Sequence, residues 1–366
     1  MTGAVHVVHQ FVPTLEPGAV GGHTLEIRRT LHELGAESEI FAEHVHPSMA
    51  GLAHDYLRYG RKVAARADDV LLYQMAIGSP VADFVRRRPQ RKAVDHHNIT
   101  PPEFFARWEP DLVHGLAWGR HQLAELAGCA SFALADSAFN EAELRALGYR
   151  DTAVVPILFD PAVFEREVDE GLLGRLGEAK AAGGADLLFV GRLAPNKAQH
   201  DLVKALAAYR RVYDPRARLH LVGGASSEVY VETLRAYAHA LGLDDAVDLA
   251  GSVPDAQLAA YYRSADVFVS ASEHEGFCVP LLEAMHHRVP IVAYAAAAVP
   301  ETLARAGILL ASKAPARVAA AVARVVADRA LRASLAEAGA ARLEDFSLAR
   351  SRARLVEALR RFGAAA

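Results

Sequence analysis

Short apolar runs alternate with helix-like segments through the first half of the chain. The run Ala4–Val8 predicts a strand. Residues Gly22–Leu34 predict a helix, because apolar side chains such as Ile27 and Leu31 recur at helical spacing. The other elements predicted here are strands at Glu39–Ala42, Val70–Gln74, Lys92–His96, Phe132–Ala135 and Val154–Leu158, and a helix at Phe139–Leu147. Strands joined by helices predict a parallel sheet covered on both faces.

A second alternating series follows a polar, glycine-rich stretch, Glu165–Gly184, which is interpreted as a linker. The strands predicted in this series are Leu187–Val190, Leu219–Val222, Val247–Leu249, Val267–Val269, Ile291–Ala293 and Ile308–Leu310. From Ala314 to Phe362 almost every residue is a good helix former. The pattern therefore predicts an α/β protein with two Rossmann-like, doubly wound parallel-sheet domains and a cleft between them.

Length and composition agree with two soluble domains. The chain has 366 residues, 52% hydrophobic and 23% charged, which is typical of globular proteins. A net charge of −4 gives no overall field that would favour nucleic acid. Cys129 and Cys278 lie far apart, without the spacing of a disulfide framework or a metal site. With no signal-peptide pattern and no apolar run of about 18 residues, we expect a cytoplasmic protein.

The most informative stretch is SASEHEGFCVPLLEAM, residues 270–285. A strand is followed by a turn with Gly276, and Pro280 then opens a helical pattern. The N–H groups at such a helix start favour a phosphate or hydroxyl ligand. Glu275 lies in the turn and Glu283 in the first part of the helix, so both carboxylates could face one ligand and bind its hydroxyls. An ordinary acidic helix cap is the alternative.

Two cations follow the first strand of the second half, in the sequence FVGRLAPNK. Arg192 and Lys197 lie just beyond the carboxyl end of that strand, the edge where open parallel sheets bind ligands. A guanidinium and an ammonium at this place can hold a diphosphate. The alternative is a solvated loop that carries two surface cations.

Two further segments bear on the site. Gly21 and Gly22, in PGAVGGHTLEI, allow close approach of the backbone to a ligand and could supply N–H groups to a diphosphate, or could be turn glycines without chemical importance. In AVDHHNITPPEFF, strand alternation sends His96 and His97 to opposite faces, so they do not easily share a metal ion. We predict no metal site.

The Glu-x7-Glu element, with Gly-Phe, Pro and Leu-Leu-Glu-Ala-Met between and after the two glutamates, resembles that of the family 4 retaining glycosyltransferases of GT-B fold. The resemblance spans nearly the full length, although residues 43–66 match no pattern of the family. It implies a first domain, 1–165 with a crossover helix in 347–366, that binds the acceptor, and a second domain, 166–346, that binds the nucleotide sugar. The Ala-rich last helix would equally allow a coiled-coil or dimer contact, so the oligomeric state stays open.

The resemblance also implies a role for each site residue. Arg192 and Lys197 would hold the leaving diphosphate, Glu275 would orient the donor sugar, and Glu283 would bind the ribose. His97, which precedes the asparagine of HNITPPEFF, would lie near the donor sugar. The remaining donor-binding positions are Gly21, Gly22, Gly276, Phe277, Cys278, Val279 and, by backbone contact with the base, Ser252 and Val253.

The predicted activity is sugar transfer from a nucleoside diphosphate sugar to a hydroxyl acceptor, with retention of configuration and without a metal or other cofactor. No D-x-D triplet occurs, which agrees with a leaving group neutralised by Arg192, Lys197 and helix dipoles. The acceptor could be a small molecule, a glycan or a lipid-linked sugar. An epimerase or hydrolase of the same fold and a non-catalytic nucleotide-sugar-binding protein remain as alternatives.

Two local features depart from this picture or add to it. The family often has glycine where Cys278 stands, and we interpret Cys278 as a small packed thiol. The basic cluster of Arg86 to Arg88, Arg91 and Lys92 is a solvated helix end or a contact for an acidic acceptor or a membrane surface.

Overall fold

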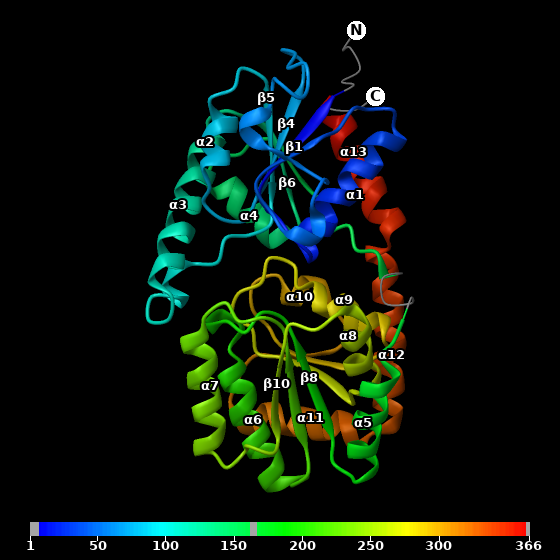
Figure 1. Cartoon of the computed structure of the whole chain (residues 1–366). Helices are drawn as coiled ribbons and strands as arrows, with labels where there is room; N and C mark the ends of the chain where they lie inside the picture. Colours follow the sequence, from blue (N-terminus) through cyan, green and yellow to red (C-terminus); the bar gives the residue numbers. More distant parts are fainter. Residues whose placement is uncertain (1–6, 162–166, 364–366) are drawn as a thin grey trace. The chain divides into compact units, whose positions relative to one another are not determined.

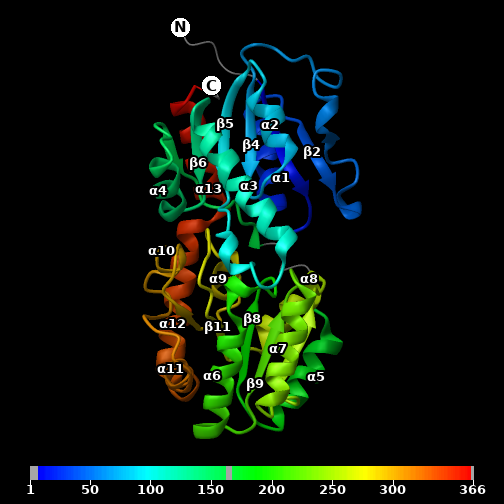
Figure 2. The same cartoon turned by 90° about the vertical axis from the view of Figure 1, so that its left-hand side faces the viewer.

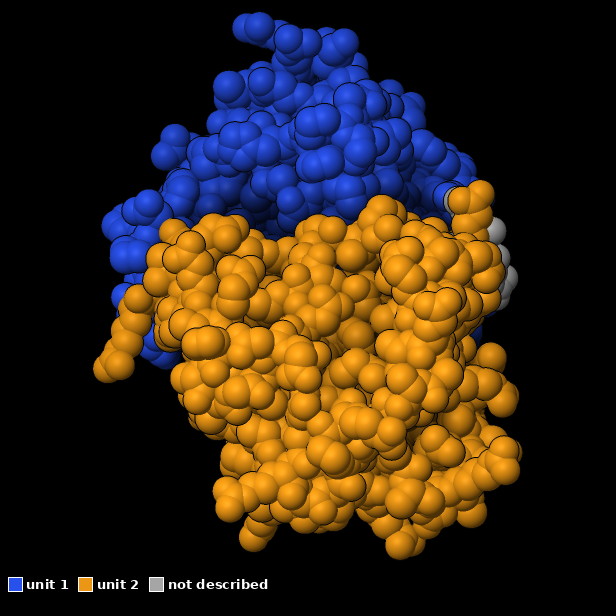
Figure 3. Space-filling view, turned by 60° about the horizontal axis from the view of Figure 1, so that its bottom comes forward, with its two compact units in different colours: residues 1–106, 110–159, 346–366 blue, residues 107–109, 160–345 orange. Residues whose placement is uncertain are grey.

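The computed structural model describes residues 7–161 and 167–363. The chain forms two compact units (Figure 3). Unit 1 comprises residues 1–106, 110–159 and 346–366, and unit 2 comprises residues 107–109 and 160–345. The breaks fall after residues 159 and 345, where we predict domain ends at 165 and 346.

Unit 1 is built on a seven-stranded parallel sheet with the order β3-β2-β1-β4-β5-β6-β7. Its strands are β1 (Val8–Leu15), β2 (Ile40–Val45), β3 (His54–Asp55), β4 (Val70–Met75), β5 (Arg91–His96), β6 (Ala130–Ala135) and β7 (Thr152–Val154). Its helices are α1 (Ala19–Glu33), α2 (Pro80–Arg86), α3 (Pro110–Ala127), α4 (Ala138–Ala146) and α13 (Leu348–Arg361).

The central strands of this sheet are almost entirely buried because helices cover both faces. Ile27 of α1 and Leu359 of α13 are fully buried in one core cluster with Val8, Val70 and Leu72. Figure 1 shows α2 and α3 on the other side of the sheet. The last helix is therefore part of the core of unit 1, although it is separated from the rest of the unit by nearly 190 residues of sequence.

Unit 2 contains a six-stranded parallel sheet with the order β10-β9-β8-β11-β12-β13. Its strands are β8 (Asp186–Val190), β9 (Arg218–Val222), β10 (Val247–Gly251), β11 (Val267–Ser270), β12 (Ile291–Tyr294) and β13 (Ile308–Leu310). Its helices are α5 (Glu170–Ala181), α6 (Gln199–Val212), α7 (Glu228–Ala240), α8 (Asp255–Ser264), α9 (Val279–His286), α10 (Val299–Leu303), α11 (Pro315–Ala327) and α12 (Arg329–Leu343).

Helices also flank both faces of the second sheet (Figure 2). Leu206 of α6, Leu234 of α7 and Val322 of α11 pack into one apolar cluster with the strands. The prediction of two doubly wound parallel sheets is confirmed.

Two sequence predictions are corrected by the structure, and a third falls mostly outside the described residues. The stretch Glu165–Gly184 contains α5 instead of a linker; the Asp169 side chain caps this helix by accepting from the N–H of Leu172. The first strand is Val8–Leu15, and most of the predicted strand Ala4–Val8 lies outside the described residues. The strand predicted at Val154–Leu158 ends at Val154, because Pro156 has no N–H to donate to a sheet.

Candidate functional site

At the carboxyl edge of the unit 2 sheet, the predicted cation Lys197 meets the predicted carboxylate Glu275. Strands β8 and β11 are neighbours in the sheet. The chain continues from β8 to β9 on one side and from β11 to β12 on the other side. Such a switch point is where open α/β sheets bind ligands. Arg192 and Lys197 follow β8, and Glu275 follows β11. The four predicted site residues Arg192, Lys197, Glu275 and Glu283 all belong to unit 2.

A short ion pair lies at this switch point. The Nζ of Lys197 is 2.7 Å from Oε2 of Glu275, and the two side chains are 17% and 9% exposed. Lys197 ends a 3₁₀ turn, Pro195–Lys197, and Ala198 then adopts a left-handed conformation before α6 begins. The loop of Glu275 is fixed to this turn, because the N–H of Glu273 donates to the carbonyl of Asn196 at 2.8 Å. Lys197 and Glu275 are therefore held in place, yet part of each side chain remains accessible.

Helix α9 carries the second glutamate of the motif. The hydroxyl of Tyr262 donates to Oε2 of Glu283 at 2.7 Å. Burial of the carboxyl group raises the pKa of Glu283 to about 7, although the Tyr262 hydrogen bond works in the opposite direction. Near neutral pH Glu283 can therefore either donate to or accept from a ligand hydroxyl, which suits the predicted contact with ribose.

The backbone just before α9 explains the glycine that the family often has at position 278. Cys278 has φ 73 and ψ 64, in the left-handed region that glycine adopts at little cost. Its thiol is buried, and burial raises the pKa of Cys278 well above its ordinary value. Cys278 is thus a packed, protonated thiol in the turn formed with Gly276, Phe277 and Val279. The carbonyl of Phe277 accepts a hydrogen bond from the hydroxyl of Thr302, which fixes this turn to α10.

Other predicted donor contacts line the same edge of the sheet. Arg192 is exposed, and its guanidinium makes no salt bridge with the residues that the structure describes. Val253 is partly buried in the loop after β10. A Cβ added to Gly224, after β9, would lie 2.7 Å from Oγ of Ser252, so the loops after β9 and β10 approach each other closely.

The glycines of unit 1 lie in the first turn of α1, after the first strand at its own switch point between β1 and β4. A Cβ on Gly21 would lie 1.9 Å from the carbonyl oxygen of Glu16, so only glycine fits there. Gly22 is exposed, but its N–H already donates to the carbonyl of Gly18 at 2.9 Å. A contact of the Gly22 N–H with a phosphate would require this hydrogen bond to break.

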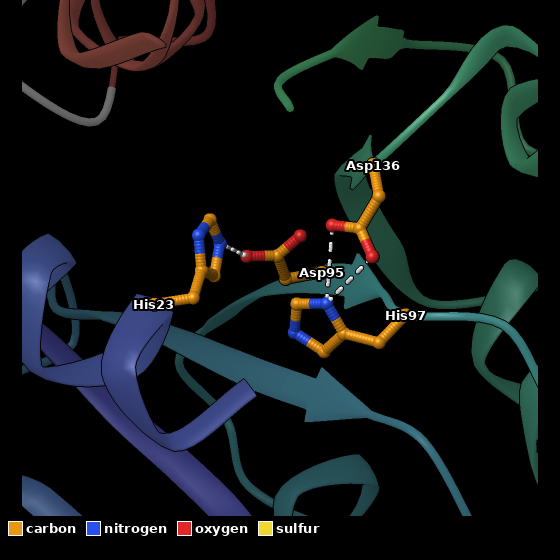
Figure 4. Close-up of side chains that lie close together, drawn as sticks. All are labelled: His23, Asp95, His97 and Asp136. Atoms are coloured by element: carbon orange, nitrogen blue, oxygen red, sulfur yellow. Dashed lines mark hydrogen bonds and ion pairs between the residues drawn. The ribbon is translucent and has the colours of Figure 1, made fainter. Parts of the chain in front are cut away.

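His97 lies just after β5 and has both ring nitrogens engaged. Nδ1 is 3.0 Å from Oδ2 of Asp136, and Nε2 is 2.5 Å from Oε1 of Gln74 (Figure 4 shows the contact with Asp136). The Gln74 amide donates to Oε1 of Gln10, and the Gln10 amide donates to the carbonyl of Thr24. Because a carbonyl can only accept, this chain fixes both amides and makes Nε2 of His97 a donor.

The hydrogen-bond directions therefore make His97 an imidazolium, with a donor on each nitrogen. Burial works to lower the pKa of His97, but the negative charges of Asp136 and Asp95 raise it to about 9. The imidazole is only 1% exposed. A direct contact between this ring and a sugar, as the sequence resemblance implies, would require one of its two hydrogen bonds to be given up.

His23, Asp95, His97 and Asp136 form a buried cluster whose potential ligand atoms lie within 4.8 Å of one another (Figure 4). Nδ1 of His23 accepts from the N–H of Leu158 at 2.9 Å, so Nε2 keeps its proton and donates to Asp95. A histidine bound in this way has no lone pair left for a metal ion. The cluster is better described as an ion-pair network around the His97 cation.

Sequence reasoning missed most members of this network and one partner in unit 2. His23 directly follows the two glycines and Asp95 precedes the two histidines, so position alone could have indicated them. Asp136 and Gln74 carry no local signal, because they meet His97 only through neighbouring strands. Tyr262 likewise reads as a core aromatic residue until Glu283 is placed beside it.

The basic cluster of unit 1 is largely engaged by the protein itself. Arg86 pairs with Asp83 and Glu125, and Arg88 lies over the ring of Phe84. Arg91 donates to the carbonyls of Phe362 and Gly363, just after α13, and Lys92 to the carbonyl of Arg88. Within residues 7–161 and 167–363, no helix is both long enough and apolar enough to span a bilayer.

Comparison with solved structures assigns the fold. The structure of Anabaena Alr3699/HepE in complex with UDP and glucose matches with a TM-score of 0.74 and 19% identity, covering 97% of this chain and 100% of that one. Sucrose-phosphate synthase of Thermosynechococcus elongatus matches with a TM-score of 0.77 and 18% identity, covering 98% and 100%. Two Rossmann-like units with these neighbours define the GT-B fold.

Comparison of sequences points to a family for unit 2. Residues 177–342 match the model of "Glycosyl transferases group 1". A GDP-mannose-dependent alpha-(1-6)-phosphatidylinositol monomannoside mannosyltransferase of Mycobacterium tuberculosis is 35% identical over 174 residues, 45% of this chain and 43% of the relative. A D-inositol 3-phosphate glycosyltransferase of Segniliparus rotundus is 35% identical over 190 residues, 49% and 42%. The chain spans less than half the length of these curated relatives.

Proposed function

We propose that the protein is a group 1 glycosyltransferase that moves a sugar from a nucleoside diphosphate sugar to an acceptor hydroxyl, with retention of configuration. The observation that carries this proposal is the Lys197–Glu275 pair at the switch point of unit 2, with Arg192 and Glu283 on flanking segments. Cations that suit a diphosphate and carboxylates that suit hydroxyls thus lie on one sheet edge of the unit whose sequence matches the group 1 model.

Each residue has a role in the proposed reaction. Lys197 and Arg192 neutralise the diphosphate as the bond between it and the sugar C1 breaks and the electron pair leaves with its oxygen. Glu275 binds hydroxyls of the donor sugar and stabilises positive charge at C1, while Glu283 binds the ribose. The acceptor oxygen bonds to C1 on the same face, and its proton passes to the departing phosphate. These side chains and the N-terminus of α9 supply charge stabilisation without a metal ion, so activity should persist in EDTA.

The names of the relatives guide the choice of substrates. One relative is named for GDP-mannose and a phosphatidylinositol mannoside, another for D-inositol 3-phosphate, and a structural neighbour holds UDP and glucose. GDP and UDP sugars are therefore the first donors to test. Acceptors with a polyol or glycan hydroxyl, free or lipid-linked, are the matching second substrates.

The test has two steps. A panel of GDP, UDP, ADP and dTDP sugars is screened for a rise in Tm, because a ligand that binds only the folded state stabilises it by mass action. Products are then analysed with the best donor alone and with inositol phosphate, inositol lipid and glycan acceptors added. A transferase gives a product that retains the anomeric configuration and forms only with an acceptor. Efficient turnover of the donor alone would identify an epimerase or hydrolase, and binding without any turnover a non-catalytic protein.

A further inference from the structure

An ionic bridge in unit 2 lies beside the proposed site and has no part in the function described so far. Lys313 follows β13, and its Nζ is 2.6 Å from Oδ2 of Asp201 in the first turn of α6. The same Nζ donates to Oε1 of Glu273, in the loop after β11. It also lies 5.5 Å from the centroid of the Tyr294 ring, which restricts where the ammonium can move.

The two carboxylates that Lys313 joins lie close in sequence to the two proposed catalytic residues. Asp201 is four residues beyond Lys197, and Glu273 is two residues before Glu275. Lys313 is 17% exposed and Asp201 14%, so the pair is shielded from water more than an ordinary surface ion pair. Burial works to lower the pKa of Lys313, but its bonds to Asp201 and Glu273 raise it overall. The bridge therefore keeps its charge at neutral pH.

The need for this bridge arises when a donor binds. In the free protein Lys197 and Glu275 hold each other directly at 2.7 Å. In the proposed donor complex Lys197 contacts the diphosphate and Glu275 the sugar, so their mutual bond is replaced by contacts with the ligand. The spacing of the two loops must then be maintained by groups that do not bind the donor. The backbone bond from the N–H of Glu273 to the carbonyl of Asn196 is one such contact, and the side chain of Lys313, which binds Asp201 and Glu273, is another.

Resting on the proposed function, we propose that Lys313 is a positioning residue, which sets the distance between the diphosphate-binding turn of Lys197 and the sugar-binding turn of Glu275. A displacement of about 1 Å between catalytic groups can lower a rate by about 100-fold. Loss of the bridge should therefore reduce turnover while the diphosphate contacts of Lys197 and Arg192 remain available.

The experiment compares Lys313→Met with Lys204→Met. Lys204 also pairs with Asp201, at 2.9 Å, but it lies on α6 itself and joins no second loop to it. We expect Lys313→Met to lower kcat for sugar transfer by about 10- to 100-fold, with the Kd for GDP or UDP alone changed less than about 3-fold. Lys204→Met should leave both values within about 2-fold. Lys313→Arg, which can bridge the same carboxylates, should restore most of kcat.

A second measurement separates positioning from folding. Glu273→Gln should lower kcat as Lys313→Met does, and the double variant should be no slower than either single one, because all three lose the same bridge. Unchanged kcat in Lys313→Met, equal loss in Lys204→Met, or loss of nucleotide binding in proportion to kcat would each overturn the inference while wild-type turnover still supports the proposed function. A wild-type protein without turnover would overturn the function, and this inference with it.

Discussion

The carboxyl edges of the two sheets both carry ionic groups, but the side chains in unit 2 are more exposed than those in unit 1. In unit 2 the side chains of Lys197 and Glu275 are 17% and 9% exposed, and Arg192 is exposed at the surface. In unit 1 the His97–Asp136 pair is 1% and 3% exposed, and each nitrogen of His97 has a fixed acceptor. The same fold element thus presents charges for exchange with a ligand in one unit and encloses them in the other.

This difference suggests different roles for the two groups: the pair in unit 2 binds a ligand, and the network in unit 1 stabilises the fold. Lys197 and Glu275 keep part of their side chains accessible to a ligand, and a diphosphate that replaces Glu275 would supply Lys197 with new counter-charge. A buried cation that loses its counter-ion leaves an uncompensated charge in a medium of low dielectric constant. We infer that the His97 network holds the segment after β5 in place, whereas the unit 2 pair carries the chemistry.

The largest expected effect comes from breaking the enclosed pair. Asp136→Asn removes the counter-ion of the His97 imidazolium, and we expect the free energy of unfolding to fall by about 3–5 kcal/mol. Asp83→Asn, in a half-exposed pair with Arg86, is the matched control and should cost below about 1 kcal/mol. Urea unfolding of both variants measures the difference. A loss from Asp136→Asn no larger than that of the control would contradict the assignment of His97 as a buried cation.

Removal of the Lys197 cation should lower the rate of sugar transfer strongly and the stability of the fold only slightly. Lys197→Ala should lower kcat by about 100- to 1000-fold, the range for loss of one donor to a developing negative charge, while Tm changes by only a few degrees. Lys204→Ala, on the helix α6 that follows the turn of Lys197, serves as the control. Steady-state transfer kinetics and thermal unfolding check both parts. Unchanged turnover would remove Lys197 from the mechanism.

Glu283 gives unit 2 a pH dependence that can be measured without a substrate. Its pKa is about 7 in the folded protein, above the ordinary 4.5, so the native state keeps a proton that the unfolded state releases. The contribution of this group to stability is therefore full below about pH 4.5 and is lost as the pH rises to about 7, by about 3 kcal/mol. Glu283→Gln, which cannot ionise, should remove this fall. Parallel stability–pH curves for the two proteins would show that Glu283 titrates normally.

The smallest effect concerns the strained turn before α9. Cys278→Gly relieves the cost of φ 73 but removes a buried side chain and adds freedom to the unfolded chain, so we expect a net change below about 1 kcal/mol. Cys278→Val should cost about 2–3 kcal/mol, because a branched side chain fits this backbone poorly. Denaturant unfolding ranks the two. Equal losses would mean that the left-handed backbone is unimportant at this position.

The sequence predicts the strands and helices of this protein better than its networks of ion pairs and hydrogen bonds. Strands such as β13 and β4 are evident because each starts with a continuous run of apolar residues, Ile-Leu-Leu and Val-Leu-Leu-Tyr. The residues of α5 predict a linker instead, because this glycine-rich, charged helix has no fully buried residue and so no clear apolar face.

The same limit applies to the candidate site. Glu275 and Glu283 could be found because they belong to one local motif with a characteristic spacing. The bridge of Lys313 with Asp201 and Glu273, by contrast, joins residues up to 112 positions apart, and only the order of the strands brings them together. Hydrogen-bond direction, which assigns the charge of His97, likewise depends on contacts between distant segments that the sequence does not reveal.

The most direct test of the account is calorimetric titration of the protein with GDP and with UDP, in the wild type, in Arg192→Ala and in the control Arg210→Ala, whose side chain pairs with Asp245. The account predicts that the wild type binds at least one of the two nucleotides, that Arg192→Ala weakens this binding at least about 10-fold, and that Arg210→Ala leaves it unchanged. A wild type that binds neither nucleotide, or an Arg192→Ala variant that binds as the wild type does, would contradict it.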